Sequence, residues 1–168
     1  SYWQKVVEIN SWQQKRITKI VVEKLFKNLS GKKIAILGFA FKAKTNDTRE
    51  SPSKIICKEL LEEGANLHIY DPKVNRRQIS IDLGIKETDE TINFSNNDGA
   101  WFYAGNLSSA VENSDAIIIM TEWEEFKLLN WETLSKTMRS PSWLFDTRAI
   151  TNIDSAKASG INVWSLGN

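Results

Sequence analysis

Residues 31–52 have the sequence GKKIAILGFAFKAKTNDTRESP, and this stretch decides the fold. Its apolar run at 34–37 predicts a buried strand, and Ser51 followed by Pro52 predicts the N-cap and first turn of a helix. The polar loop between them carries three cations: Lys42, Lys44 and Arg49. Such a strand, loop and helix start commonly hold a phosphate, because free N–H groups and the helix dipole add to the side-chain charge. The stretch therefore predicts an anion site on a βα unit.

The glycine content of this loop argues against an ordinary dinucleotide turn. Only Gly38 is present where a GxGxxG fingerprint would supply three glycines. We therefore expect a longer loop whose side chains, rather than its glycine backbone, meet the anion.

The rest of the chain repeats the alternation of strand and helix. Further strands are expected at residues 66–71, 115–120, 142–146 and 161–164, and further helices at 78–83, 107–112, 130–138 and 154–159. Residues 101–103 form either a strand or the start of a segment leading into the helix at 107. The order predicts an α/β fold with a Rossmann-like, doubly wound, mainly parallel sheet of about five strands. Ligands of such a sheet bind beyond the carboxyl ends of its strands.

A long amphipathic helix is expected before this sheet, because residues 1–28 contain no Gly or Pro and space their apolar side chains at a helical period. We expect Gly31 to end it in the left-handed conformation. The pattern lacks a capping residue at its start, so we expect the chain to begin part-way along a helix of a longer protein. Residues 1–28 would then belong to that helix and residues 29–168 to the α/β domain.

Composition narrows the class of function. Lys and Arg total 22 against 21 Asp and Glu, which disfavours nucleic acid as a partner. No apolar run approaches the roughly 18 residues of a membrane span. With one cysteine and one histidine, neither an intrachain disulfide nor a zinc cluster is possible, and a cytoplasmic setting is expected. We expect no metal, an inert buried thiol at Cys57 and a packed rather than catalytic His68.

Two cations are expected at the carboxyl edge of the sheet. Lys42 follows the first strand and Arg148 follows the strand at 142–146, so both can face one crevice and suit a pyrophosphate or another dianion. The alternative is that they are solvated loop residues paired with nearby carboxylates: Asp47, Asp71 or Asp146.

Four segments together resemble a known family: KKIAILGFAFKAKTNDTRESPS, ANLHIYDPKV, TEWEEFKLLNWETL and LFDTRAI. They are similar to the C-terminal, UDP-binding domain of the UDP-glucose 6-dehydrogenases, within the UDP-glucose/GDP-mannose dehydrogenase family. SYWQKVVEINSWQQKR resembles the last part of the long helix that links the two halves of those enzymes and forms their dimer interface. The resemblance implies an NAD-dependent, four-electron oxidation of UDP-glucose to UDP-glucuronate through a cysteine-linked intermediate.

The resemblance also assigns roles to residues. It implies that Phe41 and Lys42 meet the sugar nucleotide, that Arg148 holds the substrate, and that Arg49 reaches NAD on another domain. The NAD-binding half and the catalytic cysteine of the family precede the central helix, so this chain is expected to contain no catalytic residue and to be inactive alone. A homodimer through the first helix is also implied. At Thr147 the chain departs from the family, where a glycine usually stands. Threonine is poorly suited to positive φ, so the departure bears on the loop geometry and the pose of Arg148.

Two other functions remain open from the sequence. One is a dehydrogenase of another nucleotide sugar, such as UDP-N-acetylmannosamine or GDP-mannose. The other is a non-catalytic nucleotide-binding or dimerisation module. The segments containing HIYDPKV and TEWEEF favour UDP-glucose, whereas TRESP does not discriminate. The polar residues 73–99 indicate no chemistry.

Overall fold

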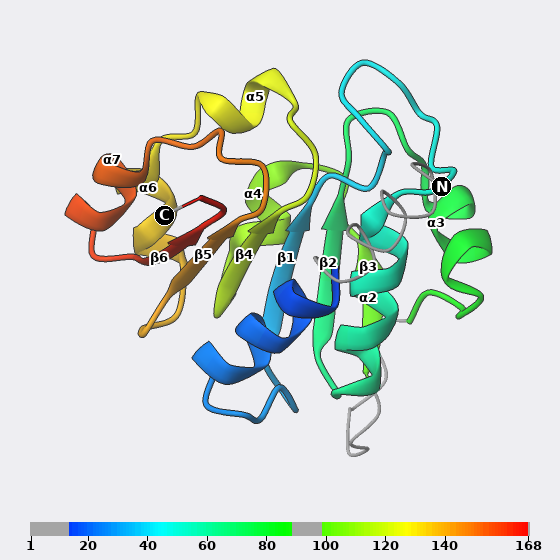
Figure 1. Cartoon of the computed structure of the whole chain (residues 1–168), viewed down its shortest axis with the longest axis horizontal. Helices are drawn as coiled ribbons and strands as arrows, with labels where there is room; N and C mark the ends of the chain where they lie inside the picture. The colour runs from blue at the N-terminus through cyan, green and yellow to red at the C-terminus, as the bar shows by residue number, and fades with distance from the viewer. Residues whose placement is uncertain (1–13, 89–98, 168) are drawn as a thin grey trace, which may run out of the picture.

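A computed structural model describes residues 14–88 and 99–167 of the chain, which form a six-stranded sheet with helices on both faces (Figure 1). The strand order is β3-β2-β1-β4-β5-β6, and every neighbouring pair is parallel. This is the doubly wound order whose direction reverses between β1 and β4. The strands are β1 Lys33–Leu37, β2 Asn66–Tyr70, β3 Ala100–Tyr103, β4 Ala116–Ile119, β5 Trp143–Asp146 and β6 Asn162–Ser165.

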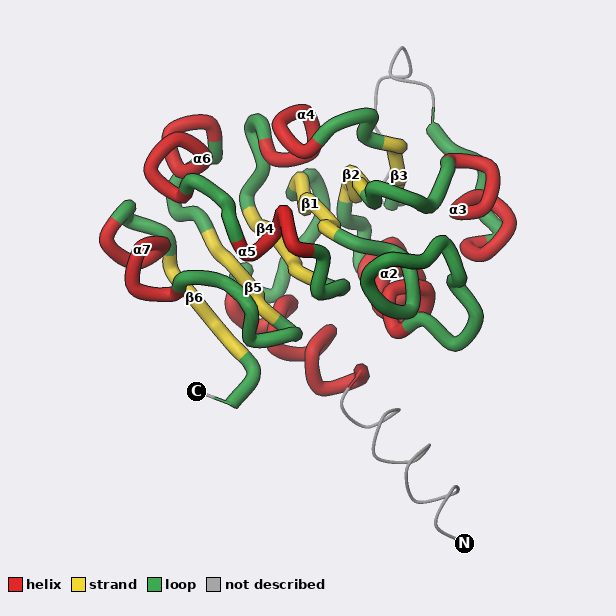
Figure 2. The backbone as a smooth tube through the Cα atoms, turned by 90° about the horizontal axis from the view of Figure 1, so that it is seen from above, coloured by secondary structure: helices red, strands yellow, loops and turns green. Residues whose placement is uncertain are grey.

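The helices cover the two faces of the sheet (Figure 2). A helix at residues 14–24 and α2 pack on one face, whereas α4 and α6 pack on the other. The labelled helices are α2 Pro52–Glu62, α3 Arg76–Leu83, α4 Leu107–Val111, α5 Glu124–Lys127, α6 Trp131–Thr137 and α7 Ile153–Ala158. Both faces of the central strands are therefore buried, and all four residues of β4 are inaccessible to solvent.

The first βα unit forms as its residues predict. Ser51 caps α2 by accepting a hydrogen bond from the Ser53 N–H at 3.3 Å, and Pro52 occupies the first turn. Gly38 follows β1 with φ of 102°, and a Cβ there would lie 2.4 Å from Thr121 Oγ1. The loop after β1 can thus cross the end of β4 closely only because this position is glycine.

The strand count differs from the expectation of about five. Residues 101–103, for which two alternatives were open, form the edge strand β3 together with Ala100, paired in parallel with β2. Trp101 is fully buried, and its indole N–H donates to the Ile85 carbonyl at 2.8 Å. Burial of this large side chain favours the strand. The short helix α5 was not predicted, because its four residues are too few to show a period.

The first helix ends earlier than expected. The described part stops at residue 24, and Phe26 and Lys27 take positive φ of 63° and 61°. The Lys27 N–H donates to the Val22 carbonyl at 2.8 Å, which closes a Schellman-type cap at Phe26 instead of at Gly31. Gly31 (φ 76°) instead serves a second turn, in which the Lys32 N–H bonds to the Leu29 carbonyl. The expected helix at residues 1–13 lies outside the described residues.

The described end of this helix shares one core with the sheet. Ile17, Val21 and Leu25 are buried in the same apolar cluster as β1 and β4. Within residues 14–88 and 99–167, no helix is long and apolar enough to cross a membrane.

Candidate functional site

A pocket of about 510 Å³ opens at the carboxyl edge of the sheet, beside the point where the strand order reverses. It draws on the loops that follow three neighbouring strands, β1, β4 and β5, together with the helix at 14–24. Its lining includes Phe41, Lys42, Met120, Glu122, Thr147 and Arg148. This is where an open α/β sheet places its ligands. The expected substrate residues Phe41, Lys42 and Arg148 are therefore brought together at one site.

Arg148 forms an ion pair with Glu122, which follows β4. Both side chains are about one-third exposed, at 32% and 31% respectively. The other oxygen of Glu122 accepts the Ala43 N–H at 3.4 Å, so this carboxylate links two walls of the pocket. The alternative prediction, that the cations pair with Asp47, Asp71 or Asp146, is wrong for Arg148, because the end of β4 brings Glu122 closer.

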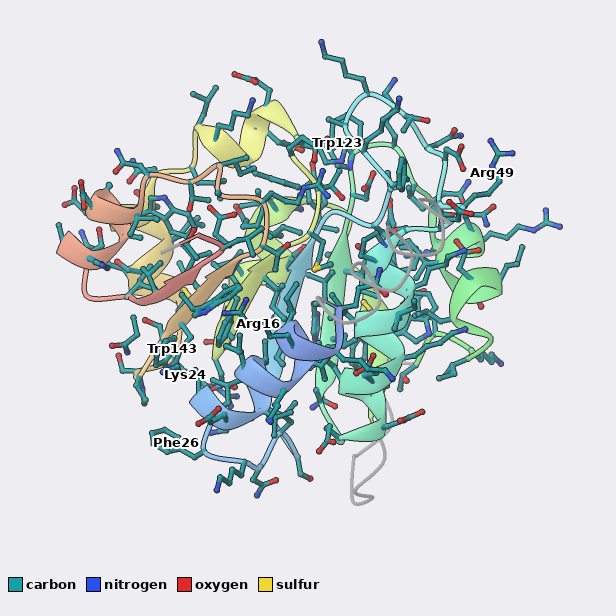
Figure 3. All side chains as sticks on the ribbon, in the orientation of Figure 1. Arg16, Lys24, Phe26, Arg49, Trp123 and Trp143 are labelled. Atoms are coloured by element: carbon teal, nitrogen blue, oxygen red, sulfur yellow. The ribbon has the colours of Figure 1, made fainter. Side chains whose placement is uncertain are left out.

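The side chains of the cationic loop after β1 point in two directions. Phe41 and Lys42 line the pocket, and 44% of Phe41 is exposed. Arg49 extends away from the body of the domain, with its side chain 88% exposed (Figure 3). Its guanidinium donates to Asp47 at 2.8–3.2 Å and holds the pKa of that carboxyl at about 2. Arg49 is thus not brought to the pocket and remains available at the surface.

Asp71 organises this loop from the end of β2. Its Oδ2 accepts the N–H groups of Phe39 and Ala40 at 2.7 and 3.0 Å and the Trp123 indole N–H at 3.2 Å. Its Oδ1 accepts the N–H groups of the two residues after Pro72, at 2.8 and 3.0 Å. This buried carboxylate therefore fixes the β1, β2 and β4 loops together. Trp123 lies at the same edge of the sheet (Figure 3).

Asp146 has the matching role in the loop that carries Arg148. Its two oxygens accept the backbone N–H groups of Arg148, Ile150 and Thr151 at 2.8–3.0 Å. Thr147 is absent from the residues with positive φ, and Ala149 takes that conformation at 55°. The Thr147 hydroxyl donates to the Ile119 carbonyl at 2.6 Å. Threonine is thus accommodated without a left-handed backbone, and it ties the end of β5 to the end of β4.

The amino end of α2 offers no open phosphate cradle. Pro52 has no N–H, the Ser51 hydroxyl caps the Ser53 N–H, and the Ser53 hydroxyl donates to the Gly38 carbonyl at 3.2 Å. The N–H groups of Phe39 and Ala40 are held by the buried Asp71. These contacts argue against a phosphate held by free N–H groups at the start of α2. The turn after β1 likewise does not fit a dinucleotide, because Asp71 already accepts the N–H groups that would bind the pyrophosphate.

Cys57 and His68 lie apart from the pocket. Cys57 on α2 is fully buried, and burial raises the pKa of its thiol. His68 on β2 stacks on Phe102 at 4.6 Å between ring centroids, and its burial lowers its pKa to about 4. Neither group supplies a nucleophile or a base to the site, in agreement with the expectation of an inert thiol and a packed histidine.

Residues 73–88, for which the sequence indicated no chemistry, support the edge of the sheet. Glu87 accepts the Tyr103 N–H at 3.2 Å and pairs with Arg76, whose guanidinium lies 5.0 Å from the Tyr103 ring centroid. Residues 89–98 lie outside the described part of the chain.

Sequence reasoning missed the role of Glu122 in the site. Glu122 lies two positions after the strand expected at residues 115–120, but nothing in its spacing identifies Arg148 as its partner. An acidic residue shortly after a two-sided apolar strand is the signal that points to this edge of the sheet.

These features define a Rossmann-like α/β domain with a side-chain-lined pocket beside its topological switch point. The chain belongs to the UDP-glucose/GDP-mannose dehydrogenase family, and its residues 35–153 match that family's UDP binding domain. The resemblance seen in the sequence is thereby confirmed.

Three known proteins illustrate the relationship. UDP-glucose 6-dehydrogenase of Pongo abelii is 43% identical over 152 residues, which cover 89% of this chain and 30% of that protein. UDP-glucose 6-dehydrogenase of Drosophila melanogaster is 39% identical over 99% of this chain and 35% of its own length. The solved UDP-D-ManNAc dehydrogenase of Pyrococcus horikoshii is 26% identical with a TM-score of 0.65, over 95% of this chain and 31% of that one. The chain therefore spans about a third of the length of these relatives.

Proposed function

We propose that this chain is the UDP-sugar-binding part of an NAD-dependent UDP-glucose 6-dehydrogenase. The supporting observation is that Phe41, Lys42 and Arg148, which the resemblance assigns to the substrate, line one pocket although they come from loops far apart in sequence. The names of the relatives, which are 36–43% identical, support UDP-glucose as the sugar nucleotide. In the full reaction UDP-glucose, two NAD⁺ and water would give UDP-glucuronate and two NADH.

Each pocket residue has a physical role in this proposal. Lys42 provides a flexible point charge for a phosphate oxygen. Phe41 presents an exposed apolar ring against which a sugar or base face can pack. Arg148, fixed by the loop around Asp146, donates hydrogen bonds from a planar fork. These residues would bind and orient the nucleotide sugar.

The chemistry itself would lie on another part of the protein. NAD would accept hydride there, since the first turn of this domain does not fit a dinucleotide. Arg49, exposed at the surface, would face that cofactor across an interdomain cleft. Cys57 is buried on α2 and cannot be the nucleophile, so the chain alone is proposed to be inactive. We also propose a preceding NAD domain, a homodimer through the first helix and a cytoplasmic location.

Titration calorimetry with UDP, GDP and NAD tests the proposal. We expect UDP to bind in about the micromolar to millimolar range and GDP and NAD to bind more weakly. Lys42→Ala or Arg148→Ala should each weaken UDP binding by about tenfold or more, because each removes a charged hydrogen-bond donor. Lys44→Ala is the matched control, since Lys44 lies on the same loop and does not line the pocket. It should leave the affinity unchanged.

The alternatives predict different results. Tighter binding of GDP than of UDP would favour a GDP-mannose enzyme. Tighter binding of UDP-N-acetylmannosamine than of UDP-glucose would favour the activity named for the Pyrococcus relative. A folded chain that binds none of these nucleotides would contradict the proposal and favour a structural module.

A further inference from the structure

Glu122 stands out among the pocket residues because the proposed function does not use it. Its carboxylate contacts both the Ala43 N–H and the Arg148 guanidinium, so it lies where the loops after β1, β4 and β5 meet. Its side chain is 31% exposed and lines the pocket, whereas its Oε2 atom is buried against Arg148, so a ligand in the pocket would lie close to this negative charge.

The charges around the pocket are unevenly arranged. Lys42 and Arg148 are balanced by Glu50 and Glu122 among the lining residues. Glu122 neutralises Arg148 directly, whereas Lys42 has no carboxylate ion-pair partner within residues 14–88 and 99–167. Within the described part of the chain, Lys42 is therefore an unpaired cation in the lining, whereas Arg148 and Glu122 form a neutral pair with hydrogen-bond donors and acceptors. A diphosphate fits beside Lys42, and a group with several hydroxyls fits beside the neutral pair.

We propose that Glu122 is a specificity-determining residue, which selects nucleotides whose diphosphate ends in a sugar over nucleotides that end in a free phosphate. This inference rests on the proposed function. A terminal phosphate beside Arg148 would lie against the Glu122 carboxylate, and the two like charges repel. Sugar hydroxyls, in contrast, carry no charge and can accept from the Arg148 guanidinium without separating the ion pair. Glu122 therefore weakens binding of UDP and leaves room for UDP-glucose.

Calorimetry on the Glu122→Gln variant provides the test. Glutamine keeps a carbonyl oxygen for the Ala43 N–H and loses the charge. We expect the affinity for UDP to rise by about fivefold, the effect of removing one unit of like charge at about 4 Å in a water-like dielectric. The affinity for UDP-glucose should not rise, so the ratio of UDP-glucose affinity to UDP affinity should fall. Glu124→Gln is the control, because Glu124 lies two positions away and pairs with Lys127 at the surface. It should leave both affinities unchanged.

Inorganic pyrophosphate separates this inference from the proposed function, because it needs neither a base nor a sugar site. Glu122→Gln should bind pyrophosphate about fivefold more tightly than the wild-type chain, even if neither protein binds UDP-glucose. That combination would contradict the proposed function, and it would still show that the Glu122 charge repels a terminal phosphate in this pocket.

The converse substitution gives a second, independent variant. In Arg148→Gln the Glu122 carboxylate loses its partner, so UDP binding should weaken more than UDP-glucose binding. Three results would each overturn the inference. The first is an equal loss of UDP and UDP-glucose affinity in Arg148→Gln, and the second is a ratio of UDP-glucose to UDP affinity in Glu122→Gln within about twofold of wild type. The third is no gain in pyrophosphate affinity in Glu122→Gln.

Discussion

Replacing Asp71 with asparagine should destabilise the whole edge of the sheet that carries the pocket. The carboxylate accepts five hydrogen bonds, three on one oxygen and two on the other. The best arrangement of the amide keeps its carbonyl on the three donors and turns its NH₂ group toward the N–H groups of Lys73 and Val74. Those two donors then lose their acceptor and face another donor.

The expected cost follows from these contacts. A buried donor without an acceptor costs about 1–3 kcal/mol, so two such donors cost about 2–6 kcal/mol. We expect a fall of about 4 kcal/mol in the free energy of unfolding, out of the about 5–15 kcal/mol that is typical of a domain. Hydrogen bonds from the loop after β1 to a neutral amide are also weaker, so UDP binding should fall with it.

The fall in the free energy of unfolding can be measured by urea unfolding followed by tryptophan fluorescence, since Trp123 itself contacts Asp71. Asp47→Asn is the matched control, because Asp47 lies on the loop after β1 and its carboxylate pairs with the exposed Arg49. That variant should unfold at the wild-type urea concentration. A loss below about 1 kcal/mol for Asp71→Asn would refute the argument that this carboxylate fixes the three loops.

Two further predictions concern positions outside the pocket. His68 is the single histidine, so its proton NMR titration is unambiguous, and its midpoint should be near pH 4 instead of 6.5. Because the unfolded chain takes up this proton first, the free energy of unfolding should fall as the pH drops from about 6.5 to 4, and His68→Phe should lack that part of the fall. Gly38→Ala should lower stability by at least about 2 kcal/mol more than Gly160→Ala, as measured by urea unfolding. Both glycines have positive φ, but only at Gly38 would the new Cβ meet Thr121, so equal losses would contradict the steric argument.

Most of the elements were predictable because their signals are local. Ser51 and Pro52 define a helix start within two residues, and the apolar run at residues 116–119 identifies a central strand without any knowledge of its neighbours. The sequence did not decide whether residues 101–103 form the edge strand β3. That strand depends on burial of Trp101 against a loop whose position the sequence does not indicate.

The candidate site was predicted in part. The expectation that Lys42 and Arg148 can face one crevice followed from a rule about strand ends, and both residues line the same pocket. The partner of Arg148 was not predicted, because three carboxylates near the strand ends were equally plausible from sequence. The backbone N–H groups of neighbouring loops use two of these, Asp71 and Asp146, and only the folded chain reveals this.

The sequence by itself determined the alternation of strands and helices, the lack of a glycine-rich phosphate turn and the cations available to an anion. These depend on residues within a few positions of one another, whose spacing is fixed by the covalent chain. The tertiary structure alone decided that Glu122 meets both Arg148 and Ala43, the latter 79 positions away in sequence. Such contacts depend on how the strands are ordered in the sheet. That order is set by packing of the whole core, so no local pattern records which loops will meet.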